Sequence, residues 1–122
     1  MARTVLFVDD SPSMRSLVHA TLKNAGFHVI EAENGQLALE AADRNSAIEL
    51  VITDINMPVM DGITFVQQLR SRSNFRYTPV LLLTTESSGD QKKKAKAVGA
   101  TGWVTKPFDP PRLVATVQRV LP

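Results

Sequence analysis

The chain of 122 residues contains no cysteine, which excludes a disulfide framework, a thiolate metal site and a redox-active thiol. Near its start it has no long hydrophobic run, because the apolar segment at 5–8 is too short for a signal peptide or a membrane span. Nor is there an excess of charge of one sign, since 14 basic and 12 acidic residues leave a formal net charge of +2. Such a balance does not make nucleic acid the default partner. We therefore expect a cytoplasmic protein that binds neither a membrane nor nucleic acid.

The chain does have the composition of an ordinary globular domain. Hydrophobic residues make up 43% and charged residues 21%, which predicts a packed core, and the length suits one monomeric domain spanning 1–122. The charges are most informative where they cluster. Acidic residues gather at Asp9, Asp10 and Asp54, whereas lysines gather at 92–96, a run that we interpret mainly as the solvated face of a helix.

Five short apolar runs alternate with segments of helical spacing. The runs are too short for helices and are followed by polar or turn-forming residues, so they predict buried strands at 5–8, 29–30, 50–52, 80–83 and 103–104. Apolar stripes predict amphipathic helices over 14–25 and 113–121, and weaker patterns predict helices at about 35–44, 62–72 and 89–98. The first stripe, expected to face the core, comprises Met14, Leu17, Val18, Leu22 and Ala25.

Residues typical of helix ends agree with these boundaries. Ser11 and Asp109 each precede a proline, the pattern of an N-cap residue followed by proline at the first helical position. Gly26 and Gly99 fall where helices are expected to end. We interpret Asp61 as the cap of the third helix and not as a site residue.

Repeated strand–helix units with near-continuous apolar strands predict an α/β fold, in which a doubly wound parallel sheet is covered by helices on both faces. In such sheets the ligand site lies beyond the carboxyl ends of the strands. The polar residues that follow the apolar runs are therefore the candidate site residues: Asp9, Asp10, Asp54, Thr84, Thr85 and Lys106.

Three carboxylates on neighbouring strand ends repel one another unless a cation or protons intervene. Mg²⁺ prefers oxygen ligands and commonly binds one or two carboxylates plus a phosphate, which suits Asp10 and Asp54 as direct ligands and Asp9 through a bound water. Asp54 is also a candidate nucleophile, because a carboxylate can form an aspartyl phosphate. Lys106 and the hydroxyl of Thr84 could then stabilise charge on the phosphoryl oxygens. His19 and His28 have no partner at ligand spacing and are expected to be structural or exposed.

Four motifs in order and spacing resemble response-regulator receiver domains, and within them the CheY-type chemotaxis regulators. The sequence reads VDDS at 8–11, TDINMPVMDG at 53–62, TTE at 84–86 and KPF at 106–108, so the resemblance covers essentially the whole chain. It implies the flavodoxin-like fold, with five strands in the order 2-1-3-4-5. It also implies a cis bond between Lys106 and Pro107.

The resemblance assigns roles to individual residues. It implies that Asp9 and Asp10 are the acidic metal pair, that Asn56 binds the metal through its backbone carbonyl, and that Asp54 is phosphorylated. Thr84 becomes the phosphoryl-sensing hydroxyl and Lys106 the essential lysine. The switch and modulating residues implied are Thr85, Glu86 and Trp103, with Asn56 and Glu86 beside the path of the hydrolytic water; receivers usually have Tyr or Phe where this chain has Trp103.

The function implied is that of a two-component signalling protein, which catalyses only its own phosphorylation and dephosphorylation. Asp54 would receive a phosphoryl group from a histidine kinase, of the CheA type, in a reaction that needs Mg²⁺. The phosphorylated form would bind an output target, such as a flagellar motor switch protein in chemotaxis. A dedicated phosphatase is a further partner that this class allows.

Other functions are weighed against this one. Within the class, a phosphorelay intermediate or a phosphate sink is the alternative. An aspartate-nucleophile phosphatase of the haloacid-dehalogenase type would carry a second aspartate where Asn56 stands, and 122 residues leave no room for its cap domain. A flavin- or nucleotide-binding module needs a hydroxyl- or glycine-rich phosphate loop, whereas Asp9 and Asp10 would repel phosphate there. A degenerate receiver that only docks would lack a required side chain, yet all are present.

Overall fold

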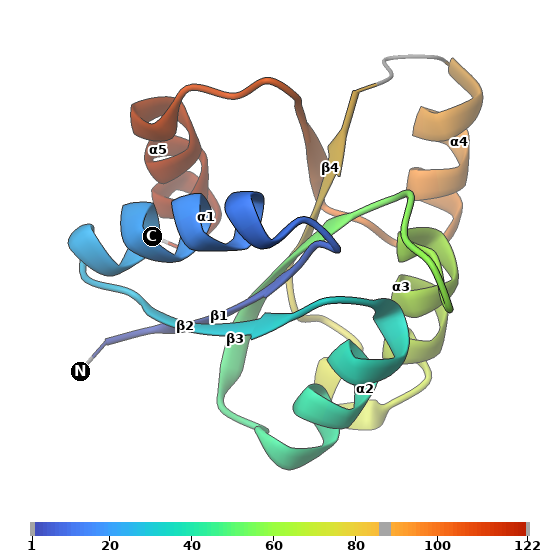
Figure 1. Ribbon diagram of the computed structural model, residues 1–122. Helices are drawn as coiled ribbons and strands as arrows, with labels where there is room; N and C mark the ends of the chain where they lie inside the picture. Colours follow the sequence, from blue (N-terminus) through green and yellow to red (C-terminus); the bar gives the residue numbers. More distant parts are fainter. Residues whose placement is uncertain (1, 86–88, 122) are drawn as a thin grey trace.

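The computed structural model describes residues 2–85 and 89–121, which form one five-stranded parallel sheet wrapped by helices (Figure 1). The strand order β2-β1-β3-β4-β5 confirms the order implied by the resemblance. All four strand pairings are parallel. The strands are β1 (Thr4–Val8), β2 (His28–Ala32), β3 (Ile48–Asp54), β4 (Val80–Thr84) and β5 (Gly102–Thr105).

All five predicted helices are present, and each follows one of the strands. The helices are α1 (Pro12–Asn24), α2 (Gly35–Arg44), α3 (Gly62–Arg70), α4 (Gly89–Ala97) and α5 (Pro110–Val120). A 3₁₀ turn, η1 (Ser73–Phe75), was not predicted because three residues are too few to show a periodicity. Among the described residues, no helix is long and apolar enough to cross a membrane.

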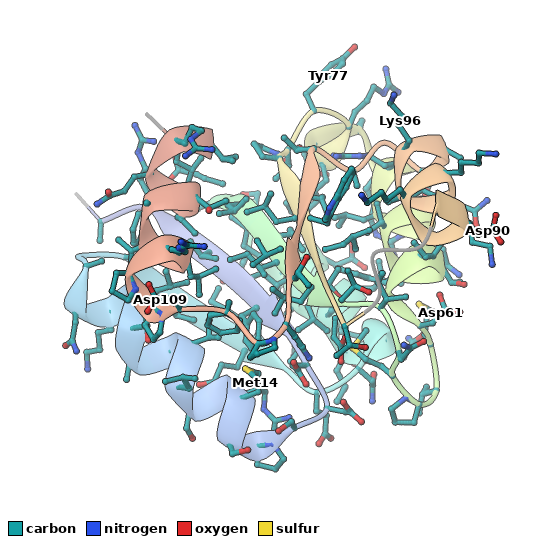
Figure 2. The ribbon with its side chains drawn as sticks, turned by 90° about the horizontal axis from the view of Figure 1, so that it is seen from above. Met14, Asp61, Tyr77, Asp90, Lys96 and Asp109 are labelled. Carbon is teal, nitrogen blue, oxygen red and sulfur yellow. The ribbon has the colours of Figure 1, made fainter. Side chains whose placement is uncertain are left out.

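The helices divide into two layers, with α1 and α5 on one face of the sheet and α2, α3 and α4 on the other (Figure 1). One apolar core forms under each layer, because the strands are buried on both faces. Under α1 and α5 lie Phe7, Leu50 and Leu83, and under the other layer lie Leu6, Val51 and Leu82. In the view from above, Asp90 and Lys96 project outward from α4, as expected for a solvated face (Figure 2).

Most predicted helix ends are confirmed. The Ser11 hydroxyl accepts a hydrogen bond of 3.2 Å from the Met14 N–H, and Pro12 occupies the first turn of α1. The Asp61 carboxylate caps α3 by accepting from the Thr64 N–H at 2.7 Å. Glycines 26 and 99 have φ of +96° and +83°, the left-handed conformation that favours glycine after a helix.

Asp109 is the N-cap residue of α5 and is followed by proline, as predicted, although its side chain makes no capping hydrogen bond. One detail of the helix predictions is wrong. Leu17 was expected to face the core, yet it is 44% exposed at the edge of the stripe on α1, where only Val18 and Leu22 are fully covered.

Candidate functional site

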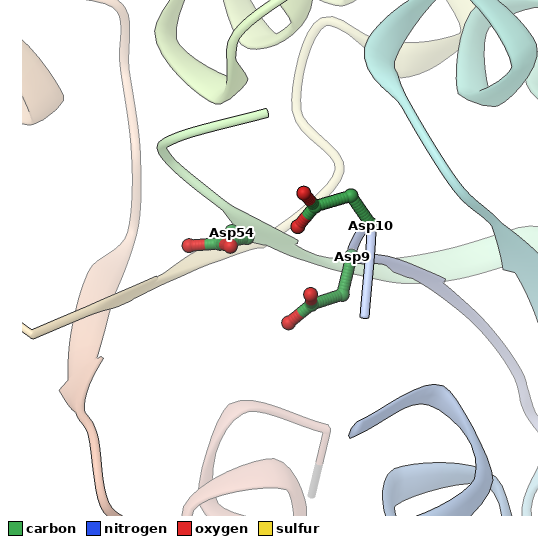
Figure 3. Close-up of side chains that lie close together, drawn as sticks. All are labelled: Asp9, Asp10 and Asp54. Atoms are coloured by element: carbon green, nitrogen blue, oxygen red, sulfur yellow. The ribbon is translucent and has the colours of Figure 1, made fainter. Parts of the chain in front are cut away.

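Three carboxylates converge at the carboxyl ends of β1 and β3, as the sequence predicts (Figure 3). Asp9 follows β1 directly, Asp10 comes next, and Asp54 is the last residue of β3. Because β1 and β3 are neighbours in a parallel sheet, their ends lie side by side, and one oxygen from each carboxylate falls within 4.8 Å of the others. Asp9 is buried, Asp54 half-buried and Asp10 exposed, so the pocket opens to solvent on the side of Asp10.

Asp9 is the most firmly held of the three. It is 1% exposed, and its N–H donates to the Ala32 carbonyl at 3.1 Å, which continues the ladder between β1 and β2. Its Oδ1 accepts from the Ser11 N–H at 2.9 Å, and its Oδ2 accepts from Lys106 Nζ at 3.1 Å. A buried carboxylate needs such partners, because burial removes the water that would otherwise solvate its charge.

Lys106 brings the one ammonium group found in this pocket among the described residues. Its Nζ lies 3.1 Å from Asp9 Oδ2 and 3.4 Å from Asp54 Oδ2, so it bridges two of the three acids. The Lys106 N–H donates to the Thr84 carbonyl at 2.7 Å, which ties the segment after β5 to the end of β4. The Lys106–Pro107 bond is cis, as the resemblance implies.

The electrostatics of the pocket leave negative charge uncompensated. Burial raises the pKa of Asp54; the Lys106 ammonium acts in the opposite direction, but the Asp9 charge adds to the rise. Burial alone would lower the pKa of Lys106, but its hydrogen bond to Asp9 and the charge of Asp54 outweigh burial and raise it. Lys106 therefore stays cationic, and one ammonium does not neutralise three carboxylates. An all-oxygen donor set of this kind suits a hard divalent cation such as Mg²⁺.

The backbone after β3 fixes Asp54 in place. Its Oδ1 accepts from the Ile55 N–H at 2.8 Å, and the Ile55 carbonyl accepts from the Gly62 N–H at 2.7 Å, so the first residue of α3 is tied to the strand end. A methyl group on Gly62 would collide with the Asp54 carbonyl oxygen and the Ile55 backbone. This role has no signal in the sequence, because Asp61-Gly62 is equally typical of a simple helix start.

The remaining predicted residues that the structure describes lie in the loop after β3, at the end of β4 and on β5. Thr84 ends β4 and is buried, while Thr85 beside it is exposed. Asn56 is exposed in the loop after β3. Glu86 lies outside the described residues. Trp103 is on β5, opposite Leu82 of β4, and is 42% exposed.

Two sets of contacts had no signal in the sequence. The ammonium of Lys92 on α4 lies 5.0 Å from the centroid of the Trp103 ring, a cation–π contact between a helix and a strand. On the other side of the molecule lies His19, which was expected to be structural or exposed; its Nδ1 is 2.6 Å from Glu31 Oε2. Arg15 contacts both Glu31 and the backbone of Asp9. Each contact joins residues from elements that only the folded sheet brings together.

The parallel sheet, the acidic pocket at its carboxyl edge and the bridging lysine together define the class of protein. The chain belongs to the response regulator receiver domain family, whose model matches residues 5–118. It is a receiver domain of two-component systems, and its single-domain relatives bear chemotaxis names.

Three relatives illustrate the similarity. The chemotaxis protein CheY1 of Helicobacter pylori is 38% identical over 118 residues, which are 96% of this chain and 95% of that protein. The structure of the chemotaxis response regulator CheY4 of Vibrio cholerae is 48% identical, with a TM-score of 0.94 over 98% of this chain and 99% of that one. The receiver domain of a sensor histidine kinase from Pseudomonas aeruginosa is 25% identical, with a TM-score of 0.91 over 99% of this chain and 98% of that one; its structure contains a magnesium ion coordinated in the active-site cleft.

Proposed function

We propose that this chain is a phosphoacceptor protein in which Asp54 takes a phosphoryl group from a histidine kinase in a reaction that depends on Mg²⁺. One observation carries the proposal: Asp54 lies beside two further carboxylates, within 4.8 Å, and beside the Lys106 ammonium, at 3.4 Å. The family membership and the magnesium in the active-site cleft of the Pseudomonas aeruginosa receiver support it. Asp9, Asp10, Asp54 and the Asn56 carbonyl would hold the metal, and the whole range 1–122 acts as one domain.

The transfer is a displacement at phosphorus. A carboxylate oxygen of Asp54 attacks the phosphorus of a phosphohistidine, so that a P–O bond forms as the P–N bond breaks and the imidazole leaves with the electron pair. The bridging position of the Lys106 ammonium lets it move from Asp54 Oδ2 onto a phosphoryl oxygen while it keeps Asp9 as its partner. Bound Mg²⁺ supplies further neutralisation of the phosphoryl charge. Thr84 acts as the sensing hydroxyl, and the exposed Asn56 side chain stands beside the path of the water that later hydrolyses the acyl phosphate.

The output role we propose is chemotaxis, with a CheA-type kinase as donor, a flagellar motor switch protein as target and a phosphatase as an optional partner. The chemotaxis names of the Helicobacter and Vibrio relatives support this choice. The surface for the target consists of Trp103, the lysines 92–96 of α4 and the start of α5. A cleft of about 370 Å³ supports it, because Trp103, Phe108 and Arg112 line the same hollow between β5 and α5.

Labelling with a small-molecule phosphodonor tests the proposal. Purified protein incubated with radioactive acetyl phosphate should incorporate label in the presence of Mg²⁺, and lose that incorporation when a chelator is added. Asp54→Asn should not be labelled, whereas Asp61→Asn, which changes the side chain that caps α3 at the Thr64 N–H, should be labelled like the wild type. Equal labelling of wild type with and without Mg²⁺ would contradict the metal assignment. Labelling of Asp54→Asn at the wild-type rate would contradict the nucleophile.

A further inference from the structure

We propose that Arg15 is a positioning residue for the acidic pocket, because it fixes the peptide bond that joins Asp9 to Asp10. The inference rests on the Mg²⁺ site proposed above and assigns a function to a residue of α1 that takes no part in the phosphoryl transfer. In this account, Arg15 sets the direction in which the two acidic side chains meet the cation.

The Arg15 guanidinium contacts the backbone of the pocket directly. Its Nη1 donates a hydrogen bond of 2.7 Å to the carbonyl oxygen of Asp9. That carbonyl belongs to the planar peptide unit between Asp9 and Asp10, so holding it in place also fixes the plane from which the Asp10 backbone continues. Only 18% of the Arg15 side chain is exposed, which limits the competition from water for this bond.

Asp10 depends on this backbone contact more than Asp9 does. The Asp9 carboxylate has its own partners, the Ser11 N–H and the Lys106 ammonium. In the parts of the chain that the structure describes, no group donates a hydrogen bond or forms an ion pair with the Asp10 carboxylate, which is exposed. Its orientation is therefore set by its own backbone, and Arg15 holds the carbonyl that precedes it.

Arg15 is itself held from the neighbouring strand. Its Nε forms an ion pair of 3.6 Å with Glu31 Oε1, and the second oxygen of that carboxylate lies 2.6 Å from His19 Nδ1. Glu31 is on β2, opposite Phe7 of β1, and so it approaches the end of β1 from the side. The guanidinium thus joins β2 to the peptide between the two acids. Groups that hold ligands in place in this way commonly change metal affinity when they are removed.

Charge and position predict opposite effects for the loss of Arg15. A cation near three carboxylates repels a second cation, so removal of the charge alone would tighten Mg²⁺ binding. Loss of the bond to the Asp9 carbonyl would instead loosen the acidic pair and weaken binding. The sign of the change in affinity therefore separates a positioning role from an electrostatic one.

The test is calorimetric titration of Mg²⁺ into wild type, Arg15→Ala, Arg15→Lys and Arg44→Ala. Arg44 is the control, because it lines the same cleft beside Arg15 and Glu31 but does not contact the Asp9 carbonyl. We expect Arg15→Ala to raise the Kd for Mg²⁺ by about 10-fold, the lower end of the effect of outer-shell substitutions. Arg15→Lys, which keeps the charge and one donor, should restore part of the affinity, and Arg44→Ala should bind at least as tightly as wild type.

Thermal unfolding without Mg²⁺ shows whether each variant is folded. If the wild type binds Mg²⁺ and Arg15→Ala binds it equally or more tightly, the positioning role is overturned while the proposed metal site stands. The same holds if Arg15→Ala does not fold and Arg15→Lys binds as tightly as wild type. A wild type that does not bind Mg²⁺ would overturn the proposed site, and this inference with it.

Discussion

At the scale of single residues, the pocket combines groups whose charges oppose folding with groups that compensate for them. The Asp54 pKa is raised because its carboxylate is buried next to Asp9, while Lys106 offsets only part of this cost. In the proposed reaction the ionised carboxylate of Asp54 is the nucleophile, and the same charge destabilises the fold. A cation that binds only the folded state would offset this loss of folding stability.

Asp54→Asn should therefore be more stable than wild type at neutral pH without divalent cations. The pKa of Asp54 is higher in the folded state than its ordinary value of 3.8, so ionising this carboxyl costs more free energy in the folded protein. Stability therefore falls as the pH rises from 3.8 through the folded-state pKa, and above that pH the loss stays constant. The advantage of the variant should vanish below about pH 3, where the carboxyl is protonated in both states. Urea unfolding at pH 3 and pH 7 measures it; an Asp54→Asn variant less stable than wild type at pH 7 without metal would contradict the account.

At the scale of elements, the start of α3 is packed against the end of β3 tightly enough to exclude a methyl group. Gly62 begins α3 against the backbone of Asp54 and Ile55. At Gly89, the start of α4, no described residue beyond its chain neighbours and its own helix comes within 4 Å of where a Cβ would lie. The two positions look alike in the sequence, since both are glycines at the start of predicted helices. Only the first carries a constraint on the site.

Gly62→Ala should destabilise the protein by about 1–3 kcal/mol, because overpacking must be relieved by a shift of backbone. That shift occurs at Asp54, so the rate of labelling by acetyl phosphate should fall as well. Gly89→Ala is the matched control and should be neutral or stabilising by up to about 1 kcal/mol. Chemical denaturation and labelling rates measure both, and equal stabilities of the two variants would show that the close approach is not maintained in solution.

The sequence predicts elements well and contacts between them poorly. The five strands and five helices follow from apolar periodicity and from residues such as Ser11 and Gly26, whose effects are local. The acids were predicted to meet because parallel strand ends share an edge. The contact of Lys92 with Trp103 and that of Arg15 with the Asp9 carbonyl depend on side-chain directions across elements, which periodicity does not fix. Asp109 is the N-cap of α5 as predicted, but whether its side chain bonds to the helix is likewise not fixed by the local pattern.

At the scale of the whole molecule, the site and the proposed output surface are connected through the end of β4 and the segment after β5. The carbonyl of Thr84 accepts from the Lys106 N–H, so a movement at the end of β4 is passed to the segment that follows Trp103. On the other side, the Lys92 ammonium lies over the indole and links it to α4. We expect phosphorylation to change the position of Trp103 relative to Lys92.

Trp103 is the only tryptophan, so its fluorescence reports the switch without labelling. Mg²⁺ and beryllium fluoride should change its emission in wild type but not in Thr84→Ala. Lys92→Met should change the emission before the mimic is added, because a cation–π contact worth about 0.5–1 kcal/mol is lost. Lys93→Met is the control, since this exposed lysine does not contact the indole. Equal responses of wild type and Thr84→Ala would mean that the indole is not coupled through Thr84.

The claim on which the whole molecule's function depends is that Asp54, and neither Asp9 nor Asp10, carries the phosphoryl group. Reduction of the acetyl-phosphate-treated protein with borohydride converts an aspartyl phosphate into homoserine, and peptide mass spectrometry then locates it. We predict homoserine at position 54 alone, and none when Mg²⁺ is withheld. Homoserine at position 9 or 10, with Asp54 unmodified, would contradict the account.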